Sequence, residues 1–121
     1  MPKPTTKSRQ ELRARFVRNA IPTEADFHDL INASLNLADD GLHKLPEQPL
    51  SLLRQKKEQP AVLRLYADAA AAEAAWQMQL IGENNPSFGL AGSGGSLALA
   101  VDGATRNVGI GTFTPKSKLH V

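Results

Sequence analysis

Apolar residues near the start of the chain recur at helical spacing. Leu12 and Phe16 are four positions apart, a spacing that places both side chains on one face of a helix. Ser8 is a preferred N-cap residue, and Glu11 three positions later completes the pattern of a capping box. We therefore predict a first helix that begins at Ser8 and ends near Asn19, a residue type that tolerates the left-handed conformation at a helix end.

A second apolar stripe predicts another helix, for which Thr23 is the N-cap. Its members occupy positions i, i+3, i+4 and i+8, namely Phe27, Leu30, Ile31 and Leu35. Gly41 is the predicted stop. Two short helices joined by a short connection predict a helical hairpin. Because neither stripe is large, we expect this hairpin to pack against a partner or a copy of itself.

Beyond Pro60 the pattern changes to alternation with a period of two, which is typical of strands. The predicted strands are 62–66, 76–80, 87–90, 96–101, 107–111 and 118–121. Glycine, proline, asparagine and aspartate separate them and favour turns. The chain is thus expected to have an α+β fold in which an antiparallel β-meander follows the helical hairpin.

The alternation also predicts which side chains share a face. Trp76, Met78 and Leu80 alternate with two glutamines, so we expect them on one side of their strand. By the same argument, one face of a later strand should carry Leu97, Leu99 and Val101.

Four regions follow from these patterns: a flexible arm (1–7), a helical head (8–41), a linker (42–60) and a β segment (61–121). The linker contains three prolines and is expected to hold one short strand around Leu50 to Leu53. The stretch 67–75 has alanine at seven of nine positions. It fits a short helix by propensity, and its small residues also suit three chains that approach an axis.

Composition favours self-association. Of the 121 residues, 41% are hydrophobic, but only 5% are aromatic, and alanine supplies much of the rest. Alanine buries little area, so partner subunits would add needed apolar burial. The chain has no cysteine, which excludes disulfides. No apolar run approaches the roughly 20 residues that span a bilayer, and we expect no membrane insertion.

Positive charge is concentrated at the start of the chain, although the net charge is only +2. The basic residues there are Lys3, Lys7, Arg9, Arg13, Arg15 and Arg18. We predict that Arg9, Arg13 and Arg15 steer docking onto an acidic protein surface; the alternative is a solvated basic face. A basic first helix could also meet nucleic acid. The charged run 54–58, however, has no interleaved aromatic residues, and we expect no nucleic-acid partner.

The sequence offers no convincing catalytic or metal site. His28, His43 and His120 are far apart and lack ligand spacing. Neighbouring carboxylates are better explained as helix-end residues. The glycine-rich run 92–96 lacks the lysine of a phosphate loop and leads into a strand. We therefore expect a structural protein without enzymatic activity, cofactor or metal.

Three segments resemble a known class of proteins. Residues 107–121 read NVGIGTFTPKSKLHV, which resembles the NVGIGTTxPxxKLxV motif of phage tail fibres and adhesin-like fibrous proteins, with Phe113 in place of a Thr or Ser. Residues 9–36 resemble the LxxxFxxxxxPTxxxFxxLIDSxLN head of tail-fibre proteins from phages and phage-derived contractile injection systems. Residues 68–80 are similar to the DxxxxxxAWxIxL stretch that follows in that group.

This resemblance implies a homotrimeric tail fibre or fibre anchor, with an intertwined trimeric β domain or shaft. Its N-terminal region would attach to the baseplate or other tail proteins, and the protein would contribute to host-cell adhesion through a possible host-surface receptor. Such a protein is made in the cytoplasm and assembled into a virion tail or an extracellular injection particle. The alternative is a glycan- or receptor-binding β module.

The residues expected in packing and trimer contacts are Leu12, Phe16, Phe27, Leu30, Ile31, Leu35, Trp76, Met78, Leu80, Val108, Ile110 and Leu119. Near a threefold axis, Gly109 and Gly111 would let backbones approach closely while Val108 and Ile110 fill the interior.

Overall fold

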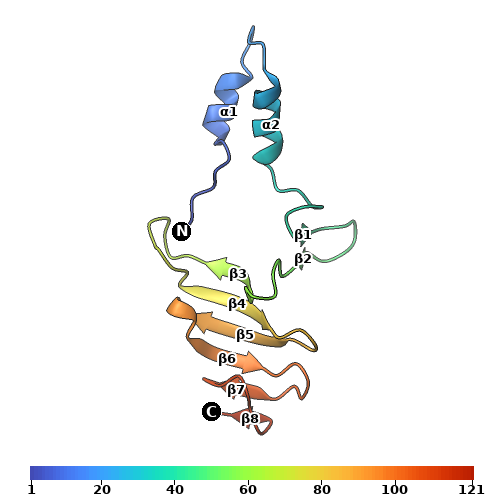
Figure 1. The fold of residues 1–121 in the computed structure, drawn as a ribbon, viewed down its shortest axis with the longest axis vertical. Coiled ribbons are helices and arrows are strands. Elements are labelled where there is room, and N and C mark those ends of the chain that lie inside the picture. Colours follow the sequence, from blue (N-terminus) through green and yellow to red (C-terminus); the bar gives the residue numbers. More distant parts are fainter. The chain divides into compact units, whose positions relative to one another are not determined.

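The computed structural model describes all 121 residues (Figure 1). The chain divides into two units: Pro2–Ser51, and Leu52–Val121 together with Met1. The boundary between them falls inside the segment predicted as a linker.

The first unit contains two helices, α1 (Arg9–Arg15) and α2 (Glu24–Asn32). Ser8 caps α1 because its hydroxyl accepts a hydrogen bond from the amide of Glu11. In α2 the capping box is reciprocal: the hydroxyl of Thr23 accepts from the amide of Asp26, and the carboxylate of Asp26 accepts from the amide of Thr23. Local sequence therefore fixes where both helices begin.

Both helices end earlier than the sequence predicted. Helix α1 stops at Arg15, although Asn19 does adopt the left-handed conformation expected of it, with a φ of 65°. Helix α2 stops at Asn32 and does not reach Gly41, so Leu35 lies outside it. The side chain of Asn36 accepts hydrogen bonds from two following amides, and such local bonds compete with helix continuation.

The two helices pack through one aromatic and one ionic contact. The rings of Phe16 and Phe27 meet edge to face with centroids 5.4 Å apart. Arg15 donates to the carboxylate of Asp26 at 2.6 Å. These contacts form the predicted helical hairpin. A short two-stranded sheet follows, in which β1 (Leu42–His43) pairs with β2 (Ser51–Leu52); only the second of these strands was predicted.

The second unit is built on a six-stranded sheet whose strands lie side by side in chain order (Figure 1). The strands are β3 (Ala61–Leu65), β4 (Trp76–Ile81), β5 (Ser87–Gly92), β6 (Leu97–Val101), β7 (Val108–Ile110) and β8 (Leu119–His120). A short 3₁₀ turn, η1 (Ser93–Gly95), joins β5 to β6. The prediction of an α+β fold with two helices before a β-meander is confirmed.

One strand pair departs from the predicted antiparallel meander. Strand β8 runs parallel to β7, with Leu119 opposite Val108. The chain turns after β7 at Gly111, whose φ is 75°, and crosses back before it re-enters the sheet. The amide of Val108 donates to the carbonyl of Lys118 at 2.9 Å, which locks the returning segment to the edge of the sheet.

The alanine-rich stretch 67–75 forms neither helix nor strand. The side chain of Asp68 accepts from the amide of Ala70 and so starts a turn. The amide of Ala75 then donates to the carbonyl of Leu65 at 2.9 Å. These bonds make the stretch the loop of the β3–β4 hairpin, against the helical propensity of alanine.

The chain has almost no interior of its own. Its buried apolar residues are Leu12, Ala91 and Ala100, and no large side chain is fully buried. Within the second unit, the extensive contacts between elements join neighbouring strands only. The sheet is therefore a single layer.

Candidate functional site: an apolar sheet face

Strand register places apolar side chains in continuous rows across the sheet. Residues directly opposite on neighbouring strands share a face. The first row contains Leu63, Met78, Leu90, Leu99 and Ile110. The second contains Leu80, Phe88, Val101, Val108 and Leu119. Leu65 lies opposite Trp76 on the same side, and we call these residues together the apolar face.

The apolar face is open to solvent. Among its larger side chains, Trp76 is 45% exposed, Ile110 49% and Leu119 62%. The remaining members are between about one third and half exposed or are half-buried. A soluble protein rarely leaves a contiguous apolar patch of this extent uncovered, and such patches are typical of binding surfaces.

The opposite face is built from small and polar residues. Its longest row is Ala61, Gln79, Gly89, Ala100, Gly109 and His120. This face is the more enclosed one, since Gln79 is 6% exposed and Ala100 is 0% exposed. The side chains along this row, which lies on what we call the small-residue face, are thus smaller and less exposed than those of the apolar face.

A bulge in β6 changes one predicted neighbour. Leu90 pairs with Leu99, but the next residue, Ala91, pairs with Leu97, so Ala98 is extra. Leu97 therefore lies on the small-residue face, and the prediction that it shares a face with Leu99 is wrong. There its methyl group and that of Ile81 approach Gly89, where an added Cβ would lie 3.5 and 3.2 Å from them.

The local structure of the chain already accounts for Gly109 and Gly111, the two glycines of the fibre-like segment 107–121. A Cβ on Gly109 would lie 2.4 Å from the carbonyl oxygen of Thr112, which folds over the small-residue face. Gly111 is needed for its left-handed φ of 75°, and a Cβ there would meet nothing within 4 Å. Both glycines can therefore be explained without the close approach of backbones at a threefold axis that the sequence analysis expected.

All the predicted packing residues of the sheet lie on the apolar face, namely Trp76, Met78, Leu80, Val108, Ile110 and Leu119. The list of expected packing residues lacked six further members, of which Leu99 and Val101 had been predicted to share a face of their strand: Leu63, Leu65, Phe88, Leu90, Leu99 and Val101. Alternation within the predicted strands carried the signal for these residues, but the register that joins them into rows could not be read from one strand at a time.

The predicted hairpin residues divide by burial. Leu12 is buried and Phe16 is half-buried, and both pack toward α2. The others are exposed: Phe27 at 50%, Leu30 at 43%, Ile31 at 67% and Leu35 at 72%. The hairpin thus also leaves an apolar stripe open.

The three predicted docking arginines differ in their surroundings. Arg9 and Arg13 are exposed and are absent from the ion pairs of the chain. Arg15 forms an ion pair with Asp26, whose carboxylate also accepts a hydrogen bond from the amide of Thr23. The Thr23 amide, and then the Arg15 guanidinium, lower the pKa of Asp26 below its ordinary value of 3.8. Arg15 therefore holds the hairpin together.

The histidines and carboxylates of the chain do not form a metal-binding group. No group of three or more histidines and carboxylates is placed to hold a metal ion. His28 lies 3.6 Å from Glu24 on the surface of α2, and Nδ1 of His120 accepts from the amide of Lys116. None of the helices is long and apolar enough to cross a membrane.

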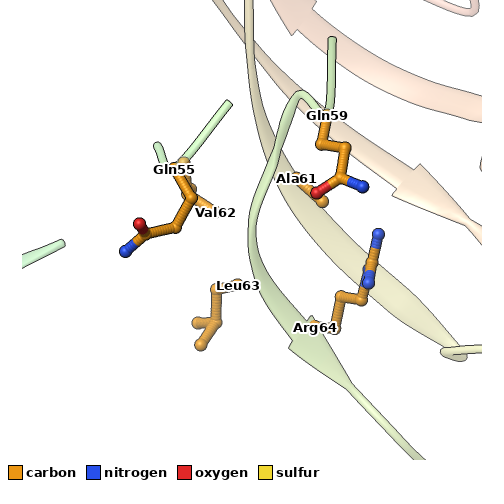
Figure 2. Close-up of a pocket in the computed structure, with 6 residues that line it drawn as sticks. All are labelled: Gln55, Gln59, Ala61, Val62, Leu63 and Arg64. Atoms are coloured by element: carbon orange, nitrogen blue, oxygen red, sulfur yellow. The ribbon is translucent and has the colours of Figure 1, made fainter. Parts of the chain in front are cut away.

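A depression of about 280 Å³ runs along β3 at the edge of the sheet. Figure 2 shows Gln55 and Leu63 on one side of the strand and Gln59 and Arg64 on the other. Because these side chains do not converge on one point, the depression has the character of an open strand edge.

The structure thus defines an α+β protein with a helical hairpin and a single-layer sheet that is apolar on its open side. No protein-family model, curated protein or solved structure matches this chain.

Proposed function

We propose that this chain is a structural subunit of a homotrimeric tail fibre, or of the anchor of such a fibre, in a phage tail or a contractile injection system. The observation that carries the proposal is the apolar face. Two rows of five apolar residues cross the sheet without a polar interruption, and copies of the same chain would cover them.

The energetics favour such self-association. Fully burying a leucine-sized side chain contributes about 1.5–3 kcal/mol to stability. In a lone subunit the side chains of the apolar face stay partly exposed, so they contribute only part of this stabilisation. Copies that turn their apolar faces inward recover it and leave the small-residue face outward. The number three comes from the resemblance to tail-fibre proteins; the exposed face by itself supports association of copies.

In this proposal the N-terminal region attaches the fibre to the baseplate or another tail protein, and the fibre contributes to recognition of the target cell. The protein acts as a structural component and performs no catalysis. The position of Trp76 on the apolar face, opposite Leu65, favours packing over the alternative of glycan binding.

Multi-angle light scattering of the purified chain tests the proposal. The expected mass is three times the 13.0 kDa of the chain at micromolar concentration. A mass of 13.0 kDa under conditions in which the sheet is folded would overturn it.

A further inference from the structure

The helical hairpin carries a hollow that its own apolar residues leave unfilled. This hollow, of about 370 Å³, is lined by Leu12, Arg13, Phe16 and Leu30. Three of its four residues are apolar, and Arg13 adds one exposed positive charge at the wall. A fitting occupant therefore combines an apolar side chain with a nearby carboxylate.

Helix α2 presents that combination on its exposed surface. Glu24, Phe27 and Ile31 are three and four positions apart in sequence, so they form one stripe along the helix. Ile31 is 67% exposed. The side chain of Glu24 is 87% exposed, and its ion-pair partner within the chain is His28, at 3.6 Å.

We propose that hairpins of neighbouring copies pack in sequence around the assembly, with Ile31 of one copy in the hollow of the next and Glu24 of the first beside Arg13 of the second. The proposal rests on the proposed function for the presence of neighbouring copies. It commits to a second copy because hollow, apolar stripe and opposite charges all occur on one hairpin. A contact between two different surfaces closes into a ring when the rotation from one copy to the next allows it, and a trimer requires such closure.

The absence of cysteine from the chain makes a crosslinking test clean. Two differently tagged full-length chains are co-expressed, one with Arg13→Cys and the other with Glu24→Cys, and treated with a short bis-maleimide. The matched control replaces Glu24→Cys with Ala25→Cys, the neighbouring exposed position on a different side of α2. We expect at least fivefold more crosslinked product from the Arg13/Glu24 pair than from the control.

Light scattering on the same samples separates the two proposals. A trimer with equal or lower crosslinking in the Arg13/Glu24 pair overturns the hairpin contact and leaves the proposed function standing. A monomer overturns both.

A second measurement guards against variants that fold poorly. Arg13→Glu should lower the unfolding temperature of the helical signal, and addition of Glu24→Lys in the same chain should restore it. Arg13 and Glu24 form no ion pair within the chain, so the restoration must come from a neighbouring copy. Additive losses would contradict the proposal.

Discussion

Leu90 in β5 lies directly opposite Leu99 in β6, and both side chains face the open side of the sheet. Met78 continues the row on one flank and Ile110 on the other. A single leucine pair would be ordinary surface variation. Its repetition across the strands makes an extended apolar surface of the kind that is typical of binding sites.

The two faces of β3 provide the first prediction. Leu63 is on the apolar face and is 38% exposed, while its neighbour Arg64 is exposed on the opposite face. Leu63→Asn should weaken assembly, seen as a shift toward monomer on dilution in light scattering, because it places an amide in the covered interface. Arg64→Asn, the matched control, should leave the assembly unchanged. Equal effects of the two substitutions would argue against the apolar face as the interface.

The turn glycine Gly103 provides a prediction about stability. A Cβ at this position would lie 1.7 Å from the carbonyl oxygen of Asn85, so Gly103→Ala must displace backbone. We expect a loss of about 1–3 kcal/mol or more in the free energy of unfolding, measured by urea denaturation.

Gly92 supplies the control for this experiment. Its nearest neighbour to an added Cβ is the hydroxyl of Ser96 at 3.4 Å, which is ordinary contact. Gly92→Ala should therefore change the free energy of unfolding by no more than about 0.5 kcal/mol. A loss of unfolding free energy for Gly103→Ala as small as that for Gly92→Ala would show that the backbone at Asn85 can move away from Gly103 easily.

The hairpin should be sensitive to acid. The pKa of Asp26 is lowered by the amide of Thr23 and then by Arg15. A carboxylate with a lowered folded pKa stabilises the protein at pH values above its unfolded pKa, and this contribution is lost as pH falls through the folded value. Helical circular dichroism should therefore decrease only below the ordinary value of 3.8.

Asp26→Asn tests the origin of this acid sensitivity. The variant should show reduced helical signal already at neutral pH and little further loss on acidification. In this variant, protonation of Asp102 should still weaken the β6–β7 turn in acid, because the amides of Thr105 and Ala104 hydrogen-bond to its carboxylate and lower its pKa. A pH dependence of the helical signal in Asp26→Asn equal to that of the parent would contradict the assignment to Asp26.

The strands could be predicted from the sequence because alternation and turn residues agree. Trp76 to Leu80 alternates strictly, and each connection between the later strands contains glycine, asparagine, aspartate or proline. Alternation assigns a residue to a face but carries no information on strand direction. The parallel entry of β8 depends on the crossover after Gly111, which a strand-by-strand interpretation cannot reveal.

Other features could not be predicted because they depend on strand pairing or on single hydrogen bonds, which the pattern of apolar and polar residues does not show. The bulge at Ala98 is visible only in the pairing of β5 with β6, and it moves Leu97 to the other face. Asp68 turns the alanine-rich stretch into a loop through its own hydrogen bond. The ion pair of Arg15 with Asp26 joins the two helices, whereas the clustered basic charge had assigned Arg15 to docking.

Tryptophan fluorescence gives the most direct test of whether copies cover the apolar face. Trp76 is the single tryptophan of the chain and lies on that face, 45% exposed in a lone subunit. In the purified protein we predict blue-shifted emission and acrylamide quenching several-fold weaker than in the denatured chain, with accessibility rising as the protein is diluted. Quenching that stays strong and independent of concentration while the sheet remains folded would contradict the account.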